Sequence, residues 1–253
     1  MRVFVTGFNS SLVQVLLKNV DQIELVKITS LTNSSSDSMS FDIHALKNFQ
    51  KGDFILHAAW NMKKRNINES RKINVQGSIN FFDSLNEEQK KSFIFISTVG
   101  AIKGTKSIYG NHKLEIENYI TAKGGRILRL GVLFDELADD LIFLQELKKT
   151  AKILPFIPNF SNRQKIYFIT EIEHLNNYFK LLRRNQAPNS FNCHEKNPIN
   201  FNHLVKNILK IDKLIVPFPL VMTMICVRWI NKLIPSFPLN VDSFEYIVSM
   251  RDR

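Results

Sequence analysis

The sequence predicts an α/β fold built on a doubly wound parallel sheet, with a smaller lobe in the second half of the chain. Short apolar runs recur along it, and segments with the apolar spacing of a helix lie between them, which is the order of βαβ units. The first run, residues 1–5, leads into a glycine turn at Thr6 and Gly7 and then into an apolar helix face from Leu12 to Leu17. A strand, a tight turn and a helix in this order open a dinucleotide-binding fold.

The remaining elements follow in the same alternation. We expect further strands over residues 23–30, 54–60, 93–98 and 126–131, with helices over 69–85 and around 107–117 between them. The helix at 69–85 has apolar residues at positions 73, 79, 81 and 82, a spacing that faces a sheet. The second half predicts a strand at 165–170, a helix at 171–184, a strand at 189–192 and a helix after Pro198. We therefore divide the chain into a dinucleotide-binding domain, 1–150, and a smaller substrate-binding lobe, 151–253, without a clean boundary.

Tyr109 and Lys113 stand four residues apart in the helix predicted after residue 107, so one helix face carries both groups. A free tyrosine titrates near ~10 and is a poor acid or base at neutral pH. A nearby ammonium favours the phenolate and lowers that value toward the working range. This pair is the main candidate for proton transfer.

The segment 107–117, which reads SIYGNHKLEIE, resembles the YGxxKLxxE signature of the extended short-chain dehydrogenases/reductases, the family of sugar-nucleotide epimerases, dehydratases and reductases. The resemblance implies that Tyr109 moves the hydroxyl proton and that Lys113 tunes Tyr109 and binds the cofactor ribose. It also implies that Thr98 holds the substrate oxygen, with Ser97 beside it in the substrate site. Ordinary hydrogen bonding at a strand end is the structural alternative for these two hydroxyls.

The glycine turn departs from the family pattern TGxxGxxG, which one branch writes TGxNGxLG. The residues kept are Thr6, Gly7, Asn9 and Leu12, whereas Ser10 and Val13 stand at the second and third glycines. The resemblance implies cofactor contacts at Gly7, Asn9, Ser10 and Leu12. Ser10 is expected to tighten the fit to the pyrophosphate, and Val13 to push the helix away from the strand, so weakened binding stays open.

Three further matches come in the family's order. Asp42 and Ile43 resemble the acidic-apolar pair that meets the adenine, and the resemblance implies that the small Ala58 and Ala59 let the backbone pass under the cofactor. Asn74 begins a stretch that resembles the family's NxxG and is expected at the cofactor. Taken alone, Asp42 is typical of a helix N-cap, and Asn74 of an amide on a helix surface.

The cofactor is expected to be NAD or NADP, with a small preference for NADP. An acidic residue at the end of the second strand would bind the ribose 2′-hydroxyl of NAD. Thr29 and Ser30 occupy that corner instead, and Lys27 lies close by, although strand alternation decides which way it points. This strand end has no carboxylate, so nothing there would repel the 2′-phosphate of NADP.

The second half resembles the substrate region of the family, where basic residues hold the nucleotide diphosphate. Arg163 matches such a position, and a solvated loop arginine is the alternative. Residues 219–234 carry an apolar run interrupted at Arg228, too short for the ~20 residues of a membrane span. Either this segment packs on the lobe or on a homodimer partner, or it lies in a membrane interface as a peripheral contact.

The charge and the cysteine content bear on nucleic-acid binding, metal sites and location. The net charge is +11, but the basic residues are scattered in pairs and no nucleic-acid motif accompanies them, so a solvated basic surface is expected and nucleic acid is not. Cys193 and Cys226 show neither metal-ligand spacing nor a disulfide pattern, which predicts no metal site and fits a cytoplasmic protein. The first strand begins at once, so no signal peptide is expected.

The sequence thus predicts an NAD(P)-dependent epimerase or reductase acting on a nucleotide-linked sugar, in polysaccharide or glycan precursor synthesis. A non-catalytic relative that uses the fold for binding or assembly is the alternative, supported by Ser10, Val13 and the short loop between Thr98 and Tyr109. The sugar and the choice between epimerisation, reduction and dehydration stay open, since the family shares the same tyrosine and lysine across all three.

Overall fold

The computed structural model describes residues 1–20, 22–31, 39–61, 66–105, 107–134, 148, 151–152, 155–159 and 166–217. Within these residues six parallel strands form one sheet in the order β12-β7-β6-β5-β1-β2. The strands are β1 (Arg2–Thr6), β2 (Glu24–Lys27), β5 (Phe54–His57), β6 (Phe93–Thr98), β7 (Arg126–Leu130) and β12 (Ser190–Cys193). The predicted α/β fold with a doubly wound parallel sheet is confirmed.

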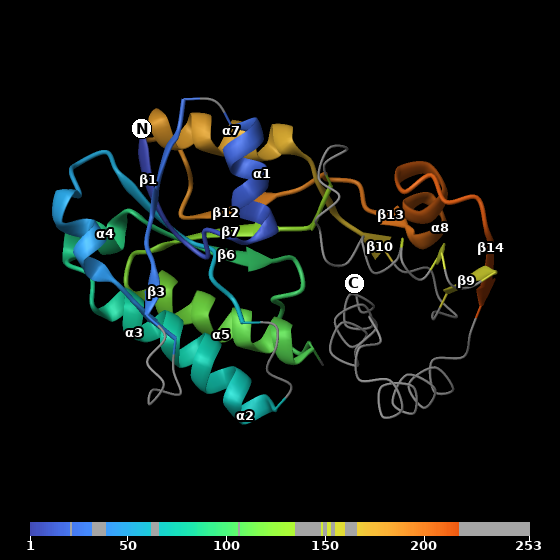
Figure 1. Cartoon of the computed structure of the whole chain (residues 1–253), viewed down its shortest axis with the longest axis horizontal. Coiled ribbons are helices and arrows are strands. Elements are labelled where there is room, and N and C mark those ends of the chain that lie inside the picture. The colour runs from blue at the N-terminus through green and yellow to red at the C-terminus, as the bar shows by residue number, and fades with distance from the viewer. Residues whose placement is uncertain are drawn as a thin grey trace.

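Helices cover both faces of this sheet (Figure 1). One face carries α1 (Ser11–Asn19) and α7 (Ile172–Arg183); the other carries α2 (Ile67–Ser70), the π-helical turn η2 (Arg71–Gln76), α3 (Gly77–Asp83) and α5 (Ile108–Ala122). The short α4 (Glu87–Lys91) precedes β6. Successive side chains of β1 divide between the two layers, because Val3 and Val5 join the core beneath α1 and α7 while Phe4 joins the other.

The central strands β1, β5 and β6 are buried on both faces, as a sheet covered by helices on both sides requires. All six residues of β6 are buried, and the four residues of β5 are buried as well. The aromatic residues of these two strands pack with those of α3: Phe93 lies edge-on to Phe82, with ring centroids 5.1 Å apart. This continuous burial holds the carboxyl ends of β5 and β6 in fixed positions.

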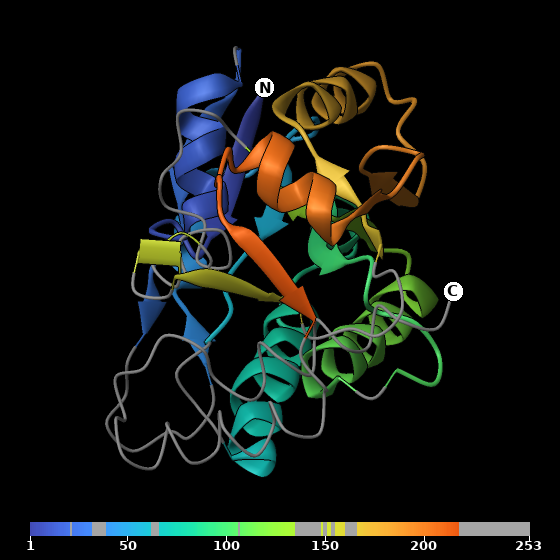
Figure 2. The same cartoon turned by 90° about the vertical axis from the view of Figure 1, so that its right-hand side faces the viewer.

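Smaller elements lie beside the main sheet (Figures 1 and 2). The two-stranded pairs are β3 (Ser30–Leu31) with β4 (Ser40–Phe41), β8 (Val132–Leu133) with β11 (Ile169–Thr170), β9 (Phe156–Asn159) with β14 (Leu214–Pro217), and β10 (Ile166–Tyr167) with β13 (Ile199–Asn200). The helical turns are η1 (Ile43–Asn48), α8 (Phe201–His203) and η3 (Leu204–Ile208). The last two pack with Tyr167 and Ile157 in a third core of their own.

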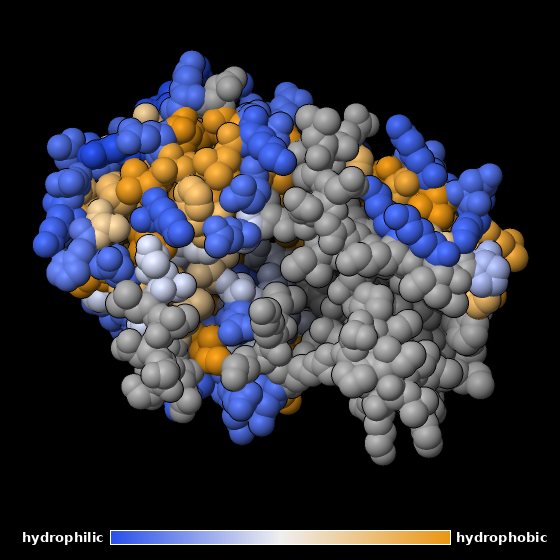
Figure 3. Space-filling view, in the orientation of Figure 1, coloured by the Kyte–Doolittle hydropathy of each residue, from blue (hydrophilic) through white to orange (hydrophobic). Residues whose placement is uncertain are grey.

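The second half of the chain contributes both to the main sheet with its helices and to the third core. Helix α7 and strand β12 belong to the main sheet layer, whereas β9, β10, β13 and β14 surround the third core. The division at residue 150 remains a prediction. Within the described residues, hydrophilic side chains cover much of the face seen in Figure 3, with apolar residues between them. None of the described helices is long and apolar enough to cross a membrane.

Candidate active site at the carboxyl edge of the sheet

The sheet order changes direction at the carboxyl ends of β1 and β5, and a ligand crevice is expected at this switch point. Strand β2 lies on one side of β1, and β5, which comes later in the chain, lies on the other, so the direction of strand order reverses at β1. Ligands of open α/β sheets bind at such a reversal. Gly7 follows β1 with φ +69°, and a Cβ placed on it would lie 2.7 Å from the Cα of Ala59. Only glycine fits here, because both the left-handed backbone and the close approach exclude a side chain.

The structure gives Ser10 and Val13 local roles of their own. Ser10 has φ −72°, a conformation open to any residue, and its hydroxyl caps α1 by accepting from the backbone N–H of Val13 at 3.4 Å. Val13 is fully buried in the core with Val3 and Val5. Asn9 is exposed and Leu12 is half-buried beside this cap. Neither of the two replaced glycines is therefore required by the backbone of this turn.

A buried hydrogen-bond chain ties the glycine turn to the opposite helix. His57 lies between Thr6 and Ser78, with its Nδ1 2.7 Å from Thr6 Oγ1 and its Nε2 2.9 Å from Ser78 Oγ. Ser78 donates to the carbonyl of Asn74 at 2.6 Å, so it accepts from Nε2–H, and His57 Nδ1 accepts from Thr6. Thr6 in turn accepts from the backbone N–H of Ala59 at 3.3 Å. The chain fixes the neutral Nε2–H tautomer of His57.

The pKa of His57 agrees with this tautomer. Burial lowers it to about 3, and the charge of Lys113 acts in the same direction. The imidazole is therefore neutral at physiological pH. Sequence reasoning did not single out this histidine, because its partners lie 51 and 21 residues away along the chain.

Asn74 holds the backbone that follows Ala58 and Ala59. Its Oδ1 accepts from the N–H of Asn61 at 2.7 Å, and its Nδ2 donates to the carbonyl of the same residue at 3.1 Å. The side chain is fully buried in the π-helical turn η2. The predicted cofactor contact of Asn74 stays a prediction, and the contacts made here fix the floor of the crevice.

Asp42 and Ile43 lie where the strand pair β3 and β4 ends. The carboxylate of Asp42 caps η1 by accepting from the N–H of His44 at 2.9 Å. Ile43 is exposed. Both are accessible to a ligand, and their predicted contact with the adenine stays a prediction.

Tyr109 and Lys113 lie on α5. Ser107 is the N-cap of this helix, and its hydroxyl accepts from the N–H of Gly110 at 3.1 Å. Lys113 is 3% exposed, and its Nζ donates to the carbonyl of Ile96 at 2.7 Å. The same Nζ lies 5.6 Å from the centroid of the Tyr109 ring. The predicted pair is thus brought together at the carboxyl end of β6.

Burial of the ammonium lowers the pKa of Lys113 to about 7, and the carboxylate of Glu117 opposes this shift. Glu117 is itself buried on the same helix and forms a two-pronged ion pair with Arg129 of β7, with Nε and Oε1 2.8 Å apart. The pair fastens α5 to the sheet. Arg129 was missed from the sequence because its partner is recognisable only once helix and strand are in contact.

Aromatic rings surround the same ammonium. Lys113 Nζ lies 4.0 Å from the ring centroid of Trp60 and 4.5 Å from that of Phe95. Trp60 also meets Tyr109 edge to face, with centroids 5.2 Å apart and planes at 82°. Trp60 was not predicted to belong to the site; the signal available was a large aromatic directly after the small pair Ala58 and Ala59 at a strand end.

Ser97 and Thr98 face different sides of β6. Strand alternation places Ser97 on the same face of the sheet as Phe95. Arg129, which stands opposite Ser97 on β7, binds Glu117 of α5, so this is the face that α5 covers. Among the described residues, Ser97 Oγ is buried and has no hydrogen-bond partner. Thr98 Oγ1 accepts from the N–H of Gly100 at 3.3 Å. The hydroxyl on the face of Lys113 is therefore that of Ser97, while the catalytic role assigned to Thr98 stays a prediction.

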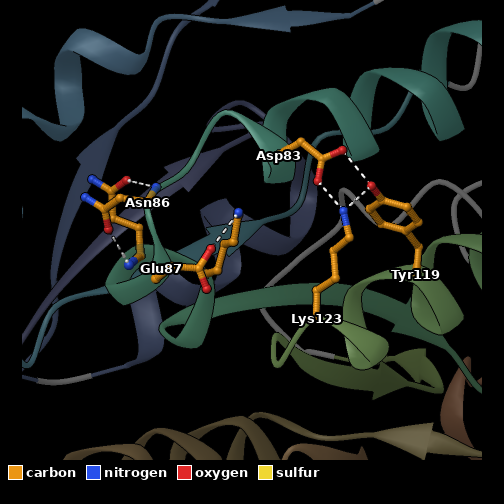
Figure 4. A network of polar contacts seen from close by, with 7 residues as sticks. Asp83, Asn86, Glu87, Tyr119 and Lys123 are labelled. Atoms are coloured by element: carbon orange, nitrogen blue, oxygen red, sulfur yellow. Dashed lines mark hydrogen bonds and ion pairs between the residues drawn. The ribbon is translucent and has the colours of Figure 1, made fainter.

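A second tyrosine and lysine at the same spacing are Tyr119 in the last turn of α5 and Lys123, the residue that caps its carboxyl end. Lys123 donates to the hydroxyl of Tyr119 and to the carboxylate of Asp83, and all three are solvent-accessible (Figure 4). The hydrogen bonds to Tyr119 and Asp83 raise the pKa of Lys123, whereas the pKa of Lys113 is lowered. Equal spacing therefore gives two different chemistries, and burial distinguishes them.

The corner that separates NAD from NADP is exposed. Thr29 and Ser30 follow β2, and Lys27 points its Nζ toward the turn after β1, 5.8 Å from the ring centroid of Phe8. The direction of Lys27, which the sequence left open, is thus toward the glycine turn. Arg163 and the segment 219–234 lie outside the described residues.

No protein-family model matches the sequence, and no curated protein matches it either. Solved structures do match. A dTDP-4-dehydrorhamnose reductase from Clostridium acetobutylicum is 18% identical with a TM-score of 0.62, over 87% of this chain and 84% of that one. A dTDP-4-dehydrorhamnose reductase from Bacillus anthracis, solved in complex with NADP, is 16% identical with a TM-score of 0.65, over 87% and 86%.

A UDP-N-acetylglucosamine 4-epimerase from Bacillus cereus is 15% identical with a TM-score of 0.62, over 87% of this chain and 85% of that one. The chain has the fold of these sugar-nucleotide enzymes. It is the fold that the resemblance to extended short-chain dehydrogenases/reductases implies. At these identities the likeness shows the fold.

Proposed function

We propose that the protein is an NAD(P)-dependent reductase or epimerase that acts on a nucleotide-linked sugar. The observation that carries the proposal is the buried Lys113 beside Tyr109 at the carboxyl edge of the sheet, next to the crevice between β1 and β5. An ammonium in this place favours the phenolate form of the tyrosine, which a proton transfer at neutral pH needs.

The residues around the crevice fit a dinucleotide. Gly7 has no side chain, so its backbone lies directly against that of Ala59. Helix α1 begins shortly after this turn, and the positive end of its dipole favours a phosphate. The ammonium of Lys113 has three N–H donors. Among the described residues one of them donates to the carbonyl of Ile96, so a ribose hydroxyl could accept from another. The same fold binds NADP in the Bacillus anthracis reductase and NAD in a complex of MoeE5 with UDP-glucose.

In the proposed reaction the bound nicotinamide supplies hydride transfer. Tyr109 exchanges the proton of the sugar hydroxyl, Lys113 favours the phenolate, and a hydroxyl at the end of β6 orients the substrate oxygen. Thr98 is the residue proposed for this last role from the resemblance, and Ser97 is the one on the face of Lys113. Replacing each by alanine separates them, because the hydroxyl that touches the substrate is the one whose loss lowers kcat.

The preference for NADP rests on the exposed corner after β2. Thr29 and Ser30 present hydroxyls, and Lys27 brings a positive charge to the same side as the glycine turn. Lys27→Ala should weaken NADPH binding and leave NADH binding as in the wild type. Equal losses for both nucleotides would show that Lys27 does not read the 2′-phosphate.

The proposed substrate class is supported by the proteins that share the fold, which are named for dTDP- and UDP-linked sugars. Arg163 is retained as the proposed contact for the diphosphate. A cytoplasmic location, a homodimer and membrane contact through residues 219–234 complete the proposal as expectations from the sequence.

The direct experiment incubates the purified protein with NADPH or NADH and a panel of dTDP- and UDP-hexoses, in both hydroxy and 4-keto forms. Oxidation of the cofactor measures reduction, and chromatography of the released sugars measures epimerisation, which leaves the cofactor unchanged overall. Turnover of one sugar class is expected. Nucleotide binding without any turnover would favour the second candidate.

That second candidate is a binding or assembly protein with the same fold. Trp60 favours it, because its indole covers the lysine that a cofactor ribose would use. The two candidates differ in one measurable property, since only the enzyme needs both NAD(P) and a sugar to bind together.

A further inference from the structure

The indole of Trp60 lies directly on the ammonium of Lys113. The distance of 4.0 Å from Nζ to the ring centroid is van der Waals contact, so no other atom fits between them. The edge-to-face contact with Tyr109, at 5.2 Å, brings the same indole against the second member of the pair. One side chain, from the segment just after β5, therefore touches both residues.

The other sides of the ammonium are closed by parts of the molecule that are fixed in place. The carbonyl of Ile96 accepts a hydrogen bond inside β6, and Phe95 of the same strand is fully buried beneath. Trp60 is half-buried and lies beyond the end of its strand. The indole lies outside the sheet, so displacing it breaks no pairing between the described strands.

We propose that Trp60 is a positioning residue that holds and covers the Lys113 ammonium, and that a ligand hydroxyl reaches Lys113 by displacing the indole. The ligand identity, NAD(P), rests on the proposed function. The contact between Trp60 and Lys113 does not, and it can be tested without any nucleotide.

The titration of Lys113 provides the first readout. Burial lowers its pKa to about 7, so the charge beneath the indole changes within an accessible pH range. In the part of the chain that the structure describes, the other ionisable groups that face it are Glu117 and Tyr109 on α5 and His57 on β5, and Arg129 of β7 is bound to Glu117. The pKa of His57 is lowered to about 3, which keeps it neutral throughout the transition.

Because the chain has two tryptophans, Trp229→Phe leaves Trp60 as the only one, and its fluorescence reports on the indole alone. Its emission is expected to change with a midpoint near pH 7. Adding Lys113→Met should abolish the transition. Adding Lys123→Met should leave it intact, although Lys123 also lies over a ring, that of Tyr119 at 4.2 Å. Absence of the transition, or its survival in the Lys113→Met protein, would overturn the contact.

Chemical accessibility provides the second readout. Acetylation of Lys113 at pH 8, measured by peptide mass spectrometry, should be about tenfold faster in Trp60→Ala than in wild type if the covered form is about ten times more populated than the open one. Trp60→Leu, which keeps an apolar side chain, guards against loss of the fold. Lys123 serves as the internal control with an unchanged rate. Equal rates for Lys113 in both proteins would contradict a cover.

NADPH titration then connects the cover to the proposed function. Removing the indole should tighten binding by up to about tenfold, since the nucleotide no longer competes with it. Weaker binding by Trp60→Ala would overturn the cover and make the indole part of the binding surface. If neither protein binds NADPH, the proposed function fails, and the acetylation rates still decide whether Trp60 covers Lys113.

Discussion

At the scale of single residues, burial determines what a tyrosine and a lysine four positions apart can do. Lys113 is almost wholly buried, with a carbonyl and aromatic rings around its ammonium, while Lys123 is accessible and bonded to Asp83. Desolvation destabilises the charge of the first, and hydrogen bonds stabilise that of the second. Only the first pair has the environment of a reactive site.

Tyr109→Phe should abolish turnover while the protein remains folded, because it removes one hydroxyl from a half-buried position. The loss of a positioned proton donor lowers kcat by about 10²–10⁴-fold. The matched control is Tyr119→Phe on the same helix, which should keep full activity. Steady-state kinetics with the substrate identified by the panel measures both, and normal turnover by the Tyr109→Phe protein would refute the proton route.

His57 should make the stability of the protein depend on pH. Its pKa is about 3 in the folded protein against an ordinary value of 6.5, so below pH 6.5 the unfolded chain binds a proton that the folded one excludes. The free energy of unfolding should fall as the pH falls through this range, by up to about 1.4 kcal/mol per pH unit. Urea unfolding at pH 7 and pH 5 measures the slope.

His57→Gln should flatten that slope, and the same change at the exposed His44 should not. The glutamine variant also loses part of the chain from Thr6 to Ser78, so its stability at pH 7 should be lower. A slope that is the same in wild type and His57→Gln would show that another group controls the pH dependence.

At the scale of elements, the crevice depends on how closely the turn after β1 approaches the end of β5. Gly7→Ala places a methyl group against the backbone of Ala59 at 2.7 Å, in addition to the strain of a positive φ. Gly52→Ala has the same kind of backbone, with φ +95°, and open space around it. Gly52→Ala should cost about 1 kcal/mol, and Gly7→Ala about 2 kcal/mol more.

NADPH binding separates the two changes further. Gly7→Ala should lose it, because the turn must shift away from Ala59, whereas Gly52→Ala should bind as the wild type does. Calorimetry at a temperature where both variants are folded makes the comparison. Unchanged binding by Gly7→Ala would place the nucleotide elsewhere.

Helix α1 is held by the residue that replaces a glycine. Val13 is fully buried, so Val13→Gly, which restores the family pattern, should leave a cavity and cost about 3 kcal/mol. Leu17→Gly at an exposed position of the same helix carries only the propensity cost of about 1 kcal/mol. Chemical denaturation measures both, and equal costs would mean that Val13 contributes no packing.

At the scale of the whole molecule, the alternation of strands and helices was predictable because the central apolar runs are buried on both faces of the sheet. The run at 93–98 became β6 and the segment after 107 became α5, close to their predicted bounds. The pairing of Tyr109 with Lys113 followed from helical spacing alone. These features depend on neighbours in the sequence.

The rest of the site depends on contacts between distant segments. Thr6 and His57 are 51 residues apart, and Trp60 contacts Tyr109 of α5 although 49 positions separate them in the sequence. The effect of Val13 was likewise not readable, because a valine at a glycine position pushes the helix away or fills a core according to the space available. The room available around Val13 depends on residues far away in the sequence, so the sequence pattern alone does not predict it.

The measurement that tests the central claim most directly is a calorimetric titration of the wild-type protein with NADPH and with NADH. Binding of both is expected, with NADPH tighter by less than about tenfold, or 1.4 kcal/mol. Lys27 and the hydroxyls of Thr29 and Ser30 favour the 2′-phosphate, but Lys27 is exposed, so its charge is screened by solvent. A preference for NADH above tenfold would show that an acidic group reaches the ribose, and binding of neither nucleotide would contradict the account.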